Sequence, residues 1–127
     1  MKLNFITIFM QDLERSVSFY QTVAGLQVVH RLQPAVGEIA FLANQEGETM
    51  LELIQLHQGE SVSVKGMVFS FHAEESLEAH RETIEAAGYT PSPIIAQGSK
   101  PPHFTLQHSD GIYVAIGIRA SFQQLFL

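Results

Sequence analysis

Two segments with helical spacing of apolar residues stand in corresponding places in the two halves of the chain. Residues 12–25 and residues 75–88 both carry acidic side chains early, apolar residues three and four positions apart, and a glycine at the end. This pattern predicts an amphipathic helix in each segment, with Gly25 and Gly88 at the C-caps. The segments align at an offset of 63 residues, and the same offset places residues 50–54 on residues 113–117. Two distant matches at one offset predict an internal repeat.

Alternating apolar and polar residues predict strands on both sides of each helix. The predicted strands are residues 3–10, 27–32, 38–43 and 49–56 in the first half, and residues 66–72, 90–95, 104–107 and 112–118 in the second. Each half is therefore a strand–helix–strand–strand–strand (βαβββ) module, and the predicted fold class is α+β.

The modules are expected at residues 1–57 and 64–119, within one structural domain, followed by a tail at residues 120–127. The tail is apolar, so we expect it to dock on the body of the protein or across a dimer interface.

Strand residues divide into two faces because successive side chains point in opposite directions. The face expected under the helices contains Ile6, Ile8, Leu51, Leu53, Phe69, Phe71, Val114 and Ile116. The opposite face mixes aromatic, small and polar residues: Phe5, Thr7, Met50, Glu52, Ile54, Val68, Ser70, Tyr113, Ala115 and Gly117. Since a sheet with helices on one face must cover or use its other face, we expect a ligand-binding cup there.

Composition and charge narrow the function classes. The formal net charge is −6 without a cluster of Lys or Arg, which argues against a nucleic-acid partner. No apolar run approaches the roughly 18 residues that span a bilayer, so no membrane insertion is expected. The chain has no cysteine, which excludes disulfides, thiolate metal sites and cysteine nucleophiles, and we expect a cytoplasmic protein.

Several motifs resemble one known family. The segment FITIFMQDLERSVSFYQTVAGLQVVHR, with its Asp-Leu-x-x-Ser-x-x-Phe-Tyr stretch followed by Gly25 and Leu26, resembles the opening of the vicinal oxygen chelate superfamily. That superfamily includes glyoxalase I, extradiol dioxygenases and bleomycin-resistance proteins. Glu85-Ala-Ala-Gly88 and Ser109-Asp-Gly111 support the resemblance in the second module. It implies paired modules in an open, U-shaped mixed sheet with helices on the outer face, around a pocket, and commonly a homodimer.

The same resemblance implies four inward metal ligands in the family's metal enzymes: His, Glu, His and Glu. In this chain these positions fall on Phe5, on Glu52, on Gly66 (or Val68 by the repeat offset) and on Ala115. Only Glu52 carries a donor atom, whereas a catalytic divalent ion needs about three protein ligands. We therefore expect no family-type metal and no cofactor.

Glu52 is the candidate catalytic or binding carboxylate, because an unpaired charge at a central strand position is costly. It is expected either to bind a cationic or hydrogen-bonding ligand group or to act as a general base. The alternative is that it is paired with Thr7, Tyr113 or Arg31, or reaches solvent. The predicted ligand-binding set is Phe5, Thr7, Phe41, Met50, Glu52, Val68, Ser70, His103, Tyr113 and Ala115.

The histidines offer a weak alternative to the family metal site. His103 follows two prolines at the expected pocket rim, but His103 and His108 are five residues apart and should lie on opposite faces of a strand. His30 and His57 are placed at strand ends.

These observations favour a metal-independent binding protein that sequesters a small aromatic or cationic molecule, and an enzyme is less favoured. One alternative is a divergent glyoxalase-like lyase or isomerase, or a dioxygenase, using Glu52 or a metal site outside the family pattern. Another is a structural or regulatory module whose pocket is filled by Phe5 and Met50.

Overall fold

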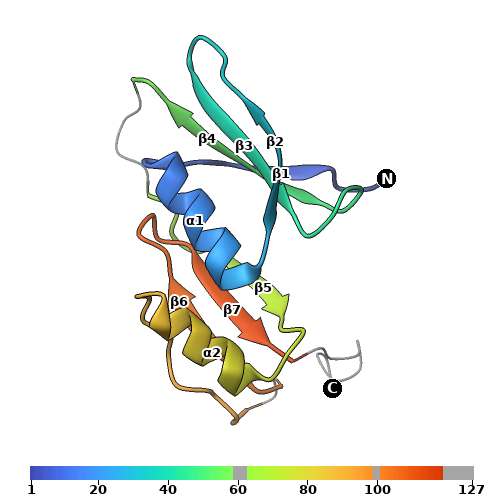
Figure 1. Cartoon of the computed structure of the whole chain (residues 1–127), viewed down its shortest axis with the longest axis vertical. Coiled ribbons are helices and arrows are strands. Elements are labelled where there is room, and N and C mark those ends of the chain that lie inside the picture. The colour runs from blue at the N-terminus through green and yellow to red at the C-terminus, as the bar shows by residue number, and fades with distance from the viewer. Residues whose placement is uncertain (59–62, 99–100, 119–127) are drawn as a thin grey trace. The chain divides into compact units, whose positions relative to one another are not determined.

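The computed structural model describes residues 1–58, 63–98 and 101–118 and divides the chain into two compact units, Met1–Ser63 and Val64–Leu127 (Figure 1). The expected C-terminal tail, residues 120–127, lies outside the described residues. Among the described helices, none is long and apolar enough to cross a membrane.

The first unit contains one helix and a four-stranded mixed sheet. Its elements are β1 (Phe5–Phe9), α1 (Leu13–Ala24), β2 (Gln27–Leu32), β3 (Gly37–Ala43) and β4 (Met50–Leu56). The strand order is β1-β4-β3-β2, with β1 parallel to β4 and the other two pairs antiparallel. This is the predicted βαβββ order, and the α+β class is confirmed.

The second unit contains one helix and a three-stranded sheet. Its elements are β5 (Val68–His72), α2 (Leu77–Ala86), β6 (His103–Gln107) and β7 (Tyr113–Gly117), in the sheet order β5-β7-β6. The parallel pairing of β5 with β7 repeats that of β1 with β4: Phe5 pairs with Met50, and Val68 pairs with Tyr113. The structure therefore repeats with the same offset of 63 residues that the sequence shows.

The strand predicted at residues 90–95 does not form. Within this segment only Ile95 bridges to His103, and Ser92 N donates to Thr105 O at 2.8 Å. Pro91 and Pro93 have no N–H to donate to a ladder, which prevents continuous pairing. In addition, the Arg81 side chain donates from Nε to Ser92 O at 2.7 Å and from Nη2 to Pro91 O at 3.1 Å.

Both helices begin at residues suited to the role, but only α1 ends at its predicted cap, because the C-cap of α2 is Ala87 and Gly88 follows it. The Asp12 side chain accepts a hydrogen bond from Arg15 N at 3.1 Å, and the Ser76 hydroxyl accepts one from Ala79 N at the same distance. These N-caps satisfy free N–H groups in the first turn. Helix α1 ends at Gly25, whose φ of 68° lies in the left-handed region that glycine adopts without strain.

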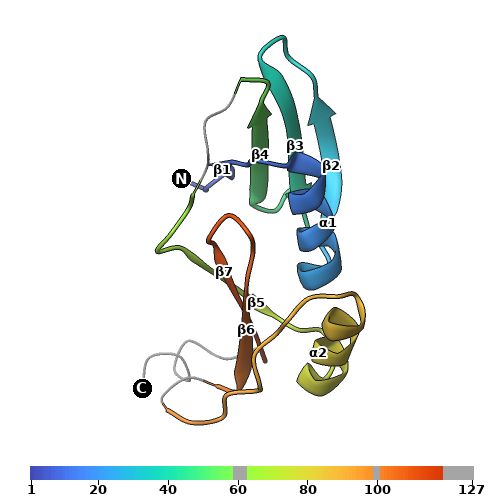
Figure 2. The same cartoon turned by 90° about the vertical axis from the view of Figure 1, so that its left-hand side faces the viewer.

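The two faces of each sheet are those predicted from alternation. On the helix face, Ile8, Leu51, Leu53, Val114 and Ile116 are buried, while Ile6, Phe69 and Phe71 are partly exposed. The α1 stripe of Leu13, Val17, Tyr20 and Val23 is buried as well. Figure 2 shows that α1 lies along one side of its own sheet and α2 along one side of its own, so neither covers the opposite face of its sheet.

Candidate functional site

Glu52 lies in the middle of β4, on the face of the sheet opposite α1. Its neighbours across the sheet are Thr7 on β1 and Phe41 on β3. The Thr7 hydroxyl donates a hydrogen bond to Glu52 Oε1 at 2.5 Å, which fixes the carboxylate toward β1. Of the pairings considered from the sequence, the one with Thr7 is therefore present.

The expected alternative of an Arg31 partner is wrong. Arg31 Nη1 donates to Glu14 Oε1 at 2.6 Å, and Nη2 donates to Glu14 Oε2 at 3.2 Å. No Lys or Arg within the described residues forms an ion pair with Glu52. The side chain is partly buried, which strengthens the attraction of its carboxylate for a cation because less water screens the charge.

Aromatic side chains lie beside Glu52 on the same face. The rings of Phe5 and Phe41 meet edge to face, with centroids 5.5 Å apart. Phe5 is 41% exposed and pairs with Met50 on the adjacent strand. The structure therefore brings together all five predicted residues of the first unit: Phe5, Thr7, Phe41, Met50 and Glu52. We name this group and the face that carries it the Glu52 face.

His30 also belongs to the Glu52 face, and the sequence prediction missed it. His30 pairs with Phe41, and their ring centroids are 6.3 Å apart with the planes tilted by 37°. One row across the four strands thus runs Thr7, Glu52, Phe41, His30.

A β-bulge places His30 in this row. The register of β2 against β3 shifts between Val28, which pairs with Leu42, and His30, which pairs with Phe41. If β2 alternated regularly through Val29 without the bulge, His30 would point toward the helix. The sequence has no glycine or proline to mark this shift. In the structure its result is that Arg31 lies on the helix face, where Glu14 is its partner.

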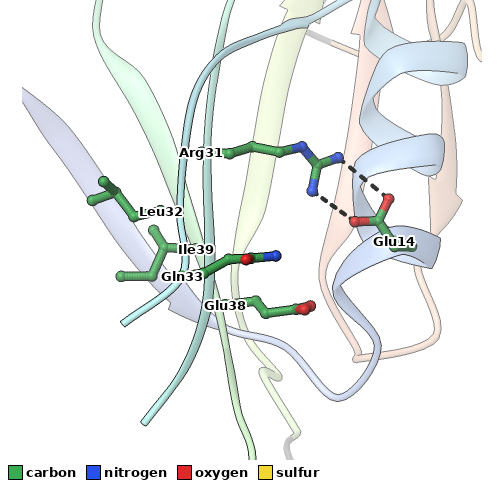
Figure 3. Close-up of a pocket in the computed structure, with 6 residues that line it drawn as sticks. All are labelled: Glu14, Arg31, Leu32, Gln33, Glu38 and Ile39. Carbon is green, nitrogen blue, oxygen red and sulfur yellow. Dashed lines mark hydrogen bonds and ion pairs between the residues drawn. The ribbon is translucent and has the colours of Figure 1, made fainter. Parts of the chain in front are cut away.

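Figure 3 shows that side chains of β2 and β3 point to the two opposite faces of the sheet. The guanidinium of Arg31 points to Glu14 on α1, whereas Leu32 and Ile39 point to the other side of the strands. The side chains drawn line a shallow hollow of about 290 Å³. A second hollow, of about 580 Å³, lies around Asn4, Asn44 and Thr49. Neither of these two hollows includes Glu52.

The predicted residues of the second unit share one face of their own sheet. Val68 pairs with Tyr113, and Ser70 pairs with Ala115. His103 lies on the same face because it pairs with Gly117, two residues beyond Ala115. Val68 is 62% exposed, and the face carries no carboxylate at the position that corresponds to Glu52.

The separation of His103 from His108 is confirmed. His103 is partly exposed, and its Nδ1 lies 2.9 Å from Pro101 O. His108 is buried, with Nε2 3.9 Å from Asp110 Oδ2. The two imidazoles therefore cannot ligate one ion together.

The residues present do not fit the family's metal. Of the positions to which the resemblance assigns ligands, Phe5, Val68 and Ala115 lie in strands but have no donor atom, and Gly66 precedes β5. The Phe5 ring packs against Phe41 instead. In the part of the chain that the structure describes, no group of three or more His, Cys, Asp or Glu side chains is placed to hold an ion. Glu52 alone supplies neither the coordination number nor the geometry.

Comparison with known proteins places this chain in one family. The model of the Glyoxalase/Bleomycin resistance protein/Dioxygenase superfamily matches residues 2–111. No curated protein matches the chain.

Solved structures with the same fold include enzymes, resistance proteins and a binding protein. Glyoxalase I of Leishmania major has a TM-score of 0.76 and 17% identity, over 93% of this chain and 86% of its own. The fosfomycin resistance protein FosX of Mesorhizobium loti has a TM-score of 0.74 and 16% identity, over 98% and 96%. The antibiotic-binding protein TnmS3 of Streptomyces sp. CB03234 has a TM-score of 0.72 and 13% identity, over 94% and 97%. At these identities the likeness shows the fold alone.

Proposed function

Since this chain belongs to the glyoxalase/bleomycin resistance/dioxygenase superfamily, we propose that it binds a small aromatic cation on the Glu52 face without a metal ion. The observation that carries the proposal is the position of Glu52 between the Thr7 hydroxyl and the Phe41 ring, as a carboxylate with no Lys or Arg partner among residues 1–58, 63–98 and 101–118. A carboxylate beside aromatic rings attracts a planar cation through charge, hydrogen bonding and cation–π contact.

The apolar surroundings of Glu52 support a ligand of this class. Phe5 and Phe9 expose 41% and 48% of their surface on the same face, and Ile54 lies beside Glu52 along β4. Contiguous exposed apolar side chains around a few polar groups are typical of a binding surface. The net charge of −6 also favours the approach of a cation. TnmS3, with the same fold, is an antibiotic-binding protein.

Binding of a defined probe tests the proposal. Benzamidine is a planar aromatic cation, and benzamide is its neutral counterpart of nearly the same shape. We expect benzamidine, but not benzamide, to shift the backbone amide NMR signals of Phe5–Phe9 and Met50–Leu56 in the presence of EDTA. Equal shifts with both compounds, or shifts confined to other strands, would refute the proposed site.

A second candidate is an enzyme of the lyase, isomerase or dioxygenase type with Glu52 as general base. The Thr7–Glu52 hydrogen bond favours it, since a fixed carboxylate is suited to proton transfer, and glyoxalase I shares the fold. The test is turnover of a hemithioacetal or a catechol by the wild type and by Glu52→Gln. Turnover that Glu52→Gln abolishes would favour the enzyme over the binding protein.

We further propose that the protein is cytoplasmic and forms a homodimer, with no nucleic-acid partner. The exposed apolar residues of the open sheet faces support self-association, since monomers rarely expose large contiguous apolar areas. Sedimentation equilibrium measures this directly, and a single monomeric species at micromolar concentration would contradict the dimer.

A further inference from the structure

The bulge in β2 gives the Glu52 face a second polar group. Glu52 and His30 stand on either side of Phe41 in one row, on strands β4, β3 and β2. Strands in a sheet are about 4.8 Å apart, so the backbones of Glu52 and His30 are roughly 10 Å apart. An aromatic ring that bears a polar group at each end has a length suited to the space between two such side chains.

The chemistry of the two ends differs. Glu52 is a hydrogen-bond acceptor that favours a positive charge, and its Oε1 already accepts from Thr7. His30 is exposed, and the nitrogens of its imidazole can donate or accept a hydrogen bond. The Phe41 ring between them presents an apolar surface, and its contact with Phe5 limits its movement.

The position of His30 is held from the opposite side of the sheet. Arg31, the next residue, makes two hydrogen bonds to Glu14 on α1, at 2.6 and 3.2 Å. Neighbouring residues of a strand point to opposite faces, so an Arg31 side chain held on the helix face keeps His30 on the Glu52 face. The bulge and the ion pair together make His30 a specificity residue.

We infer that the ligand is a para-disubstituted aromatic compound, with a cationic nitrogen bound by Glu52 and a hydroxyl or similar hydrogen-bonding group bound by His30. This inference rests on the proposed function and deepens it, because it names the second recognised group. Benzamidine has only the cationic group that Glu52 would bind. The compound 4-hydroxybenzamidine also has a hydroxyl group, opposite the cation, that His30 would bind.

The experiment compares the dissociation constants of these two probes by NMR titration, in EDTA, for four proteins: wild type, His30→Ala, His30→Gln and His57→Ala. His57 is an exposed histidine that follows β4, which makes it the matched control. For the wild type we expect 4-hydroxybenzamidine to bind about threefold to tenfold more tightly, as one added hydrogen bond would give. His30→Ala should abolish this advantage, His30→Gln should restore part of it, and His57→Ala should keep it.

Each other outcome has a definite meaning. Equal affinity of the two probes for the wild type, or an advantage that survives His30→Ala, would overturn the role of His30 while the proposed function stands. If neither probe binds, the proposed function fails and this inference fails with it.

Discussion

Arg31 and Glu14 form a two-bond ion pair between β2 and α1, with Nη1–Oε1 at 2.6 Å and Nη2–Oε2 at 3.2 Å. The side chains are 44% and 67% exposed, so solvent screens most of their attraction. The pair therefore orients β2 more than it stabilises the fold.

Removal of this pair should have a small effect on stability. We expect a double-mutant cycle of Arg31→Ala and Glu14→Ala to give a coupling free energy of about 0.2–1 kcal/mol, the range for exposed pairs. Urea unfolding of the four proteins measures it. A coupling several times larger would show that the pair is a major stabilising contact, contrary to the exposure of both side chains.

The bulge residue Val29 should be dispensable for the two faces of β2. Deletion of Val29 leaves Val28 opposite Leu42 and His30 opposite Phe41, so alternation alone keeps His30 and Arg31 on their present faces. We expect the deletion variant to fold and to retain the His30–Phe41 contact, detected as nuclear Overhauser effects between the rings. Insertion of one alanine between His30 and Arg31 is the matched control, and it should turn Arg31 away from Glu14.

The repeat predicts equivalent core positions in the two units. Leu53 and Ile116 occupy the same place on β4 and β7, and both are almost completely buried. Truncation of either to alanine should lower the free energy of unfolding by about 2–5 kcal/mol, because it removes buried methyl groups and leaves a cavity. Denaturant unfolding tests both, and a loss below about 1 kcal/mol at either position would contradict the assignment of that face to the core.

The Thr7 hydroxyl should matter for binding more than for folding. Thr7→Val keeps a β-branched residue in β1 but releases Glu52 Oε1, so the carboxylate must be ordered again when a ligand binds. Ordering one side chain on binding costs about 0.5–1.5 kcal/mol. We therefore expect benzamidine to bind Thr7→Val about two- to twelvefold more weakly than the wild type. Titration of the variant measures it.

Thr49→Val is the control for this substitution. The Thr49 hydroxyl donates to Leu3 O at 2.9 Å, away from Glu52. We expect a similar change in stability and an unchanged benzamidine affinity. Equal affinity in the Thr7 and Thr49 variants would show that the hydroxyl of Thr7 does not prepare the carboxylate.

The spacing of apolar residues in the sequence predicted which side chains of the helices and strands face the core. The helix stripe of Leu13, Val17, Tyr20 and Val23 and the two faces of β1 and β4 follow from side-chain direction alone. Thr7 was only one of the partners that the sequence left open for Glu52, and the structure shows that bond. The parallel registers of β1 with β4 and of β5 with β7 were not predicted; the repeat offset predicted only that residues 50–54 and 113–117 are equivalent.

Two features could not be predicted because they arise from non-local pairing. The segment at residues 90–95 alternates like a strand, but Pro91 and Pro93 remove the donors that a ladder needs, and Arg81 takes the free carbonyls. The bulge at Val29 has no glycine or proline to mark it, so strict alternation misplaces His30. In the first case two prolines within the segment and Arg81 outside it decide the outcome, and in the second case the pairing of β2 with β3 does.

The most direct test of the account is the affinity of benzamidine, in EDTA, for Glu52→Gln and for Glu38→Gln. Glu38 is partly buried like Glu52, but it pairs with Gln55, three residues along both strands from the Phe41–Glu52 pair, so it points to the helix face. We predict that Glu52→Gln weakens binding at least tenfold, about 1.4 kcal/mol, while Glu38→Gln leaves it unchanged. Equal losses in the two variants, or no loss in either, would contradict the claim that the Glu52 carboxylate binds the ligand.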